Sequence, residues 1–264
     1  MQDFQFHRPE NVAAAVSTLK KRPDGKVLGG GQSLIPVMKL GLAAPTDLVA
    51  VTGLSELRGI RVEGKELVVG AAATHAEVAE SAEVKKAIPA LADLAGHIGD
   101  PQVRNRGTLG GSLAHNDPAA DYPAAVLALG ATVVTDRRKI AADDFFKGMF
   151  QTALAADEVV VAVRFPVPEK AAYAKFPHPA SRFALAGVMV AKGPAGVRVA
   201  VTGAGAGVFR VKAMEDALAK KWSPDALAGL TVPATGLTSD PFGSAEYRAH
   251  LVGVLARRAV AASL

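Results

Sequence analysis

Two glycine-rich runs constrain this chain more than any other feature. The first is VLGGGQSLIPVMKLG, residues 27–41, and the second is VRNRGTLGGSLAHNDPAAD, residues 103–121. Each pattern predicts a strand-like approach into a loop with few side chains, followed by a polar residue and an apolar segment. A backbone without side chains can approach a ligand closely and direct several N–H groups at one anion. Two such loops predict a ligand with an extended anionic middle, such as the pyrophosphate of a dinucleotide.

Composition narrows the class of protein. The 264 residues suffice for a large core, and the absence of cysteine excludes disulfides and Cys-ligated zinc or iron–sulfur clusters and favours a cytoplasmic location. No apolar run has the roughly 18 residues of a transmembrane segment, and the N-terminus MQDFQFHRPE lacks the apolar core of a signal peptide. The net charge is +5, but Lys and Arg are scattered and aromatics make up only 5%. We therefore expect no nucleic-acid binding, whereas a basic cleft for an anionic ligand fits equally well.

The pattern of apolar residues and turn signals divides the chain into three units. Residues 1–54 are expected to form a small α/β unit with a helix over 9–21 and strands over 26–28 and 47–51. Residues 55–166 are expected to begin with a hairpin and to continue with a helix that starts at the capping box Thr74–Glu77 and another that starts at Pro89. Residues 167–264 should contain strands over 184–191 and 197–201 and a C-terminal helix over 245–262.

Familiar catalytic and binding motifs are missing. GGGQS lacks the Lys-Ser or Lys-Thr of a P-loop, and residues 203–207 have the spacing GxGxG, which we interpret as a turn after a strand. The six histidines are not spaced as metal ligands, although His115 in the second run is either a ligand contact or simply exposed. Asp121 either favours the start of its own helix or contacts a ligand. By default Lys175 is an exposed strand residue. With no catalytic triad and no acid–base pair, the pattern favours a protein whose reactive group is a cofactor.

The two runs together resemble a known family. GGGQSLIPVMKLGLAAPTDLV and IGDPQVRNRGTLGGSLAHNDPAADYPAAVLALGA are similar to the FAD-binding medium subunits of molybdenum hydroxylases. That family includes the carbon monoxide dehydrogenase medium subunit and the flavin domain of xanthine dehydrogenase. The resemblance extends from FHRP at residue 6 through DDFFKG and DEVVVAVRFPVP to GSAEYRAHLVGVLARRAV near the C-terminus. The combined motifs are specific, whereas either glycine run alone is not.

The resemblance implies an α+β fold and a set of cofactor contacts. The fold would be a two-part FAD-binding unit of the vanillyl-alcohol-oxidase (PCMH) type, followed by a C-terminal α+β domain of the carbon monoxide dehydrogenase flavoprotein type. FAD would lie extended between the first two units, while Val159 and Val160 would pack on its ring system and Lys175 would lie near the isoalloxazine. The remaining FAD contacts, carried over by motif position, would be Val27, Leu28, Gly29, Gly30, Gly31, Gln32, Ser33, Leu34, Val103, Gly107, Thr108, Gly110, Gly111, Ser112, Ala114, Ala120 and Asp121.

The activity that the resemblance implies is electron transfer. Substrate would be hydroxylated at a molybdenum cofactor on a large subunit, and electrons would pass through [2Fe–2S] clusters on a small subunit to FAD on this chain. The external acceptor would be NAD, a quinone, oxygen or another carrier, and the assembly a dimer of heterotrimers. No catalytic residue and no metal ligand is implied on this chain. The family often has Asp-Tyr where this sequence has Arg182-Phe183, which puts a hydroxyl contact near the flavin in doubt. The alternative is an autonomous FAD-dependent oxidoreductase with its own small-molecule substrate, which requires an acid or base beside the flavin.

Overall fold

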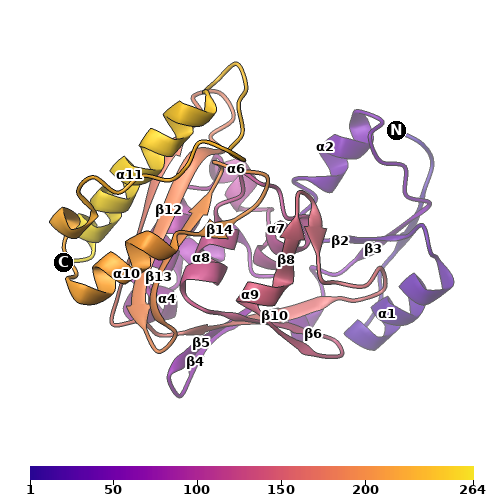
Figure 1. Cartoon of the computed structure of the whole chain (residues 1–264). Coiled ribbons are helices and arrows are strands. Elements are labelled where there is room, and N and C mark those ends of the chain that lie inside the picture. Colours follow the sequence, from indigo (N-terminus) through magenta and orange to yellow (C-terminus); the bar gives the residue numbers. More distant parts are fainter.

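A computed structural model describes all residues from Met1 to Leu264. The first part of the chain forms a small parallel sheet of order β1-β3-β2, at the right of Figure 1. Asn11 caps the helix that covers this sheet, because its side chain accepts a hydrogen bond from the N–H of Ala14. Apolar side chains of that helix, including Ala15 and Leu19, pack on Val49. The elements are β1 (Gln5–His7), α1 (Val12–Lys21), β2 (Lys26–Leu28), α2 (Leu34–Lys39), β3 (Asp47–Ala50) and η1 (Ser55–Leu57).

The middle of the chain builds an antiparallel sheet of order β4-β5-β10-β6-β7, seen at the bottom of Figure 1. Its strands are β4 (Ile60–Glu63), β5 (Glu66–Gly70), β6 (Thr132–Thr135), β7 (Lys139–Ala141) and β10 (Val160–Pro166). The predicted hairpin is confirmed as β4–β5. Between these strands lie α3 (His75–Glu80), α4 (Ala82–Ala87), α5 (Pro89–Gly96), α6 (Pro101–Arg104), α7 (Leu109–His115), α8 (Tyr122–Ala128), α9 (Ala142–Phe145), β8 (Phe146–Gly148) and β9 (Gln151–Thr152). The capping box at Thr74 and the start of a helix at Pro89 are also confirmed.

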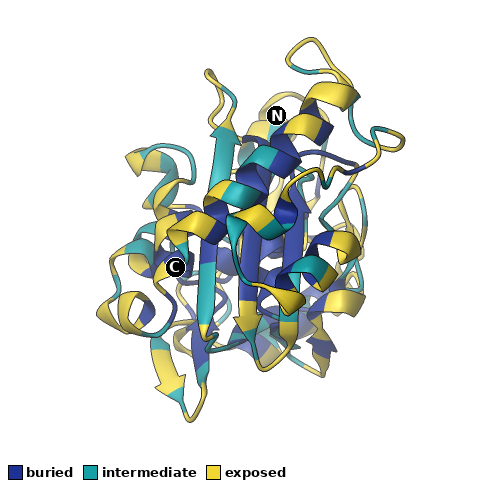
Figure 2. Cartoon of the chain, turned by 60° about the vertical axis from the view of Figure 1, so that its left-hand side comes forward, coloured by how far each residue is buried: buried dark blue, intermediate teal, exposed yellow.

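The last part of the chain is a four-stranded antiparallel sheet with helices on both faces. Its elements are β11 (Lys170–Pro177), β12 (Ala184–Gly193), β13 (Gly196–Thr202), β14 (Phe209–Arg210), α10 (Lys212–Lys220), η2 (Pro224–Leu227) and α11 (Ala245–Ala262). Helix α11 packs on β11 and β12, while α5 and α8 of the middle part pack on β11, β12 and β13. The central strand β12 is therefore buried on both faces, and Figure 2 shows dark blue strands beneath the half-exposed helix α11.

The hydrophobic cores show how these parts are joined. One core of 33 residues contains Leu67 of β5 together with Tyr173, Met189 and Ala200 of the last sheet. A separate core of 10 residues lies under α1 and β3. The middle and last parts therefore share one core, whereas the core under α1 and β3 also includes Ala72 and Val159 of the middle part. The boundaries 54/55 and 166/167 stay predictions.

The local structure of the glycine runs differs in part from the sequence prediction. The second run is not approached by a strand, because the short helix α6 ends within its first residues, and Gly110 and Gly111 lie in helix α7. Thr108 caps this helix by accepting a hydrogen bond from the N–H of Gly111, and buried Leu109 and Leu113 anchor it in the core. Tertiary packing thus outweighs the low helix propensity of glycine. In the first run, Ser33 precedes α2 but its side chain makes no capping hydrogen bond to that helix.

Candidate functional site

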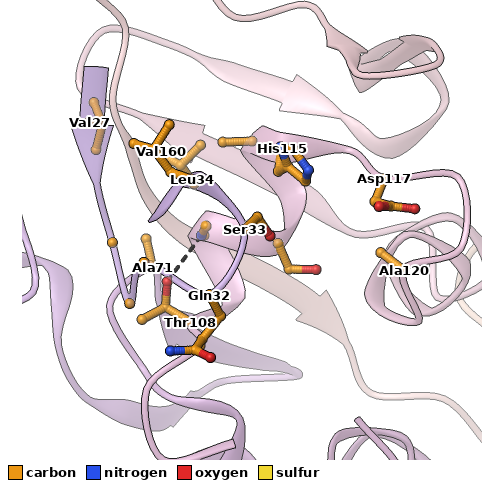
Figure 3. A pocket seen from close by; sticks show the side chains of 18 of the residues that line it. Val27, Gln32, Ser33, Leu34, Ala71, Thr108, His115, Asp117, Ala120 and Val160 are labelled. Atoms are coloured by element: carbon orange, nitrogen blue, oxygen red, sulfur yellow. Dashed lines mark hydrogen bonds between the residues drawn. The ribbon is translucent and has the colours of Figure 1, made fainter. Parts of the chain in front are cut away.

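A large cavity lies where the first part of the chain meets the middle part. It has a volume of about 850 Å³. All the cofactor contacts expected from the sequence line it, except Leu28 and Lys175. Figure 3 shows Gln32 and Thr108 close together on one side of the cavity, with His115, Asp117 and Ala120 farther along its wall. The structure therefore brings both glycine runs to one cavity.

The glycines of the two runs allow the backbones to touch each other. A Cβ atom on Gly30 would lie 1.6 Å from the carbonyl oxygen of Arg106, which no side chain can accommodate. A Cβ atom on Gly110 would lie 2.6 Å from the Cβ of Ala71, which directly follows strand β5. The sequence interpretation explained these glycines by the approach of a ligand. The structure adds a second reason for a glycine at position 30. Without a Cβ atom there, the backbones of the two runs can come into contact.

The two runs differ in the number of backbone donors they offer a ligand. Residues 29–33 donate no backbone hydrogen bond to any other part of the protein, although this stretch lines the cavity. In the second run, the N–H groups of Leu109 and Gly110 already donate to the carbonyl oxygens of Ala73 and Ala71, at 3.0 and 2.8 Å. The N–H of Gly111 donates to the hydroxyl of Thr108 at 3.1 Å. Free donors for an anion are therefore concentrated in the first run, and the cavity fits the pyrophosphate expected there.

Lys175 occupies a different position from the one expected by default. Its side chain is only 5% exposed, and its Nζ lies 3.0 Å from Oδ2 of Asp121 and 3.1 Å from the carbonyl oxygen of His97. The hydroxyl of Tyr173 donates to Oδ1 of Asp121 at 2.6 Å. Burial raises the pKa of Asp121, and the neighbouring ammonium opposes that effect. Asp121 lines the cavity, whereas Lys175 lies behind it, so the lysine acts on the site through the carboxylate.

His75 is a site residue that the sequence reasoning passed over. It is buried at the first position of α3, lines the cavity, and its Nδ1 has no hydrogen-bond partner. Burial lowers the pKa of its imidazole to about 4, with a smaller contribution from the charge of Arg104. Its ring lies 5.4 Å from that of Tyr122, whose hydroxyl is also buried without a partner. The capping box located this histidine at a helix start, but nothing in the sequence indicated that the start faces a cavity.

The carboxylates on the cavity wall are engaged within the protein. Glu158 binds the guanidinium of Arg138 at 2.7 Å, and that contact lowers the pKa of Glu158 to about 2. Asp121 is paired with the ammonium behind it, and Asp117 accepts a hydrogen bond from the N–H of Ala119 at 2.8 Å. The wall therefore offers no unpartnered carboxylate as a general acid or base. The buried valines Val159 and Val160, where β10 begins, supply apolar surface to the cavity.

Two further observations bear on the class of protein. No group of three or more His, Asp or Glu side chains in the chain is placed to hold a metal ion. None of the helices combines the length and the apolar character needed to cross a bilayer.

Comparison with known proteins identifies relatives over nearly the full length. Residues 2–168 match the model of the FAD binding domain in molybdopterin dehydrogenase. The chain is 40% identical to the nicotine 6-hydroxylase medium subunit of Paenarthrobacter nicotinovorans, with 97% of this chain and 96% of the relative covered. It is 35% identical to the carbon monoxide dehydrogenase medium chain of Hydrogenophaga pseudoflava, with 98% and 96% covered.

Solved structures give the same result. A carbon monoxide dehydrogenase chain from Hydrogenophaga pseudoflava superposes with a TM-score of 0.90 at 36% identity, covering 99% of this chain and 97% of that one. A chain of quinoline 2-oxidoreductase from Pseudomonas putida superposes with a TM-score of 0.88 at 29% identity, covering 98% and 96%. The expected α+β fold of the carbon monoxide dehydrogenase flavoprotein type is confirmed.

Proposed function

The chain belongs to the family of FAD-binding subunits of molybdenum hydroxylases, and we propose from this premise that it carries electrons between a partner subunit and an external acceptor. The expected cofactor, FAD, and the expected class, an oxidoreductase subunit, are confirmed by the family match and by the relatives. Bound FAD supplies the redox chemistry. The contribution of the protein is to bind the cofactor, orient it and limit the access of water.

One observation carries the assignment of the cavity to FAD. The backbone donors of residues 29–33 are free, and they lie against a second backbone that Gly30 allows to approach to contact distance. This arrangement suits a pyrophosphate, which takes several N–H donors at short range. The residues proposed to contact the cofactor are those named from the sequence, with Lys175 acting through Asp121 and with Leu28 supporting the first run from behind the cavity wall.

We extend the proposal to the partners. Relatives of this chain are named as medium subunits or medium chains, which supports a complex with a large subunit that holds a molybdenum cofactor and a small subunit that holds [2Fe–2S] clusters. The sequence has no cysteine, so Cys-ligated clusters must lie on another chain. Electrons would pass from those clusters to FAD here and then to NAD, a quinone, oxygen or another carrier. A dimer of heterotrimers and a cytoplasmic location are parts of the same proposal.

The alternative is an autonomous FAD-dependent oxidoreductase. That activity requires an acid or base beside the flavin to act on the substrate. The carboxylates on the wall are engaged, and a pKa lowered to about 4 makes His75 a weak base without an imidazolium proton to donate at neutral pH. This engagement of the acidic groups favours the electron-transfer subunit.

Two experiments test the proposal. The purified chain, reconstituted with FAD and passed through a gel-filtration column, should retain the yellow flavin spectrum, and a colourless product would refute the cofactor site. Affinity purification of the full-length chain from its native host should recover a larger subunit that contains molybdenum and a smaller subunit that contains iron. If the native protein instead reduces an acceptor by itself and recovers neither metal, the alternative is correct.

A further inference from the structure

Strained backbone is concentrated at the cavity. Besides glycines, only Asn116, Phe150 and Arg182 have a positive φ, at 49°, 55° and 61°. Phe150 and Arg182 line the cavity, and Asn116 precedes Asp117, which also lines it. A bulky residue such as phenylalanine rarely adopts this conformation, and it persists only where the surrounding structure enforces it.

Asn116 provides that enforcement for Phe150. It is buried, and its Nδ2 donates to the carbonyl oxygens of Gly148 and Gln151, both at 2.8 Å. Its own carbonyl oxygen accepts a hydrogen bond from the N–H of Phe150 at 3.2 Å. One side chain and its backbone therefore fix the turn between β8 and β9 from both sides. A turn held by so many contacts presents the residue at its tip in one defined position.

The ring that this turn presents is not used in the hydrophobic core. Phe150 is 53% exposed, belongs to none of the core clusters, and lies on the cavity wall. Its ring centroid is 5.1 Å from that of His115, at an angle of 48°, which lies within the range of aromatic contacts. Leaving a large aromatic side chain half exposed in a strained conformation costs stability, so a role outside folding is indicated.

We propose that Phe150 is a cofactor-contacting residue, whose ring packs against one of the planar rings of bound FAD, and that Asn116 is its positioning residue. The proposal rests on the assignment of the cavity to FAD. An aromatic side chain suits this position because flat π-systems stack favourably and exclude water from the ring they cover. The strained turn then serves to place the ring before the cofactor binds.

The positive φ makes a discriminating substitution possible. Phe150→Gly removes the ring and also relieves the backbone strain, because glycine adopts this conformation freely. If Phe150 were only a turn residue, Phe150→Gly would leave FAD binding unchanged and would raise or maintain the melting temperature of the protein without FAD. If the ring contacts FAD, the same variant should keep that melting temperature while losing affinity for FAD.

The experiment compares four full-length variants with the parent chain by FAD titration, followed by the absorbance of bound flavin and by the quenching of flavin fluorescence by iodide. Phe150→Gly should weaken FAD binding about 3- to 10-fold, the range expected for loss of one aromatic contact. Phe150→Tyr should bind FAD as the parent does. Asn116→Gly retains the left-handed backbone but loses the amide contacts, and should weaken binding in the same direction. Phe6→Ala is the matched control, since Phe6 is 48% exposed and does not line the cavity.

The outcomes separate the possible contacts. Weaker binding of FAD by Phe150→Gly with a shifted flavin spectrum and stronger iodide quenching places the ring on the isoalloxazine. Weaker binding with an unchanged spectrum places it on the adenine. Parent-level affinity and quenching in Phe150→Gly would overturn the proposal. Failure of the parent chain itself to bind FAD would instead overturn the assignment of the cavity.

Discussion

Substitution of Gly30 by alanine tests the way in which the two glycine runs meet. The added Cβ would lie 1.6 Å from the carbonyl oxygen of Arg106, about 1.8 Å closer than an ordinary van der Waals contact of 3.4 Å. A backbone carbonyl cannot rotate away as a side chain does, so the runs must separate. Overpacking of this kind costs about 3 kcal/mol. For a chain of this size we expect a fall in melting temperature of about 6 to 12 °C.

Binding of FAD should be affected more strongly than stability. Separation of the runs displaces the free N–H donors of residues 29–33, and each hydrogen bond to a charged group contributes about 1.5–3 kcal/mol. We therefore expect FAD affinity to fall by about 10- to 100-fold or more. Thermal unfolding of the protein without FAD and titration with FAD measure the two effects.

A control variant isolates the close contact. Gly53→Ala adds the same atom where nothing lies within 4 Å, and it should change stability by less than about 0.5 kcal/mol. Gly111→Ala is intermediate, because its Cβ would meet the movable hydroxyl of Thr108 at 2.8 Å. A Gly30→Ala protein that melts and binds FAD as the parent chain does would refute the contact between the runs.

Three further substitutions probe the buried polar groups. Lys175→Met leaves the carboxylate of Asp121 buried without a cation and should lower the free energy of unfolding in urea by about 3–5 kcal/mol. Adding Asp121→Asn should restore part of this loss. If the double variant recovers no stability, the pairing of these two residues is contradicted. Burial lowers the folded-state pKa of His75 to about 4, below an unfolded value of 6.5, so the unfolded state binds the proton first. The free energy of unfolding should have its full value above pH 6.5 and fall by about 3 kcal/mol as the pH decreases to about 4. In urea titrations at each pH, His75→Gln should make the free energy of unfolding less dependent on pH. Arg248→Met leaves the carbonyl oxygens of Leu185 and Gly203 without their guanidinium donor, and calorimetry should show a loss of about 2–6 kcal/mol, with an unchanged melting temperature counting against it.

Much of the fold could be predicted because its signals are local. The capping box at Thr74 and the proline at the start of α5 each act on neighbouring residues of the chain, so the sequence locates both helix starts correctly. Helix α7 could not be predicted, because its stability depends on the packing of Leu109 and Leu113 into a core that is assembled from distant segments.

The site, like the fold, could be predicted from the sequence only in part. The two glycine runs and the resemblance identified FAD, and nearly all the contact residues that they predicted line the cavity. The sequence could not show that Lys175 lies behind Asp121, because that pair joins β11 to the start of α8 across 54 residues. The position of Phe150 depends on Asn116, which lies 34 residues earlier in the chain and is itself in a left-handed conformation.

The sequence by itself therefore determined which cofactor this protein takes and predicted which two stretches contact it, because runs of glycine can be read directly from the residues. The tertiary structure decided how the glycines are used and which donors remain free. Those properties depend on distances between segments far apart in the chain, such as the contact between Gly30 and Arg106. Only folding sets those distances.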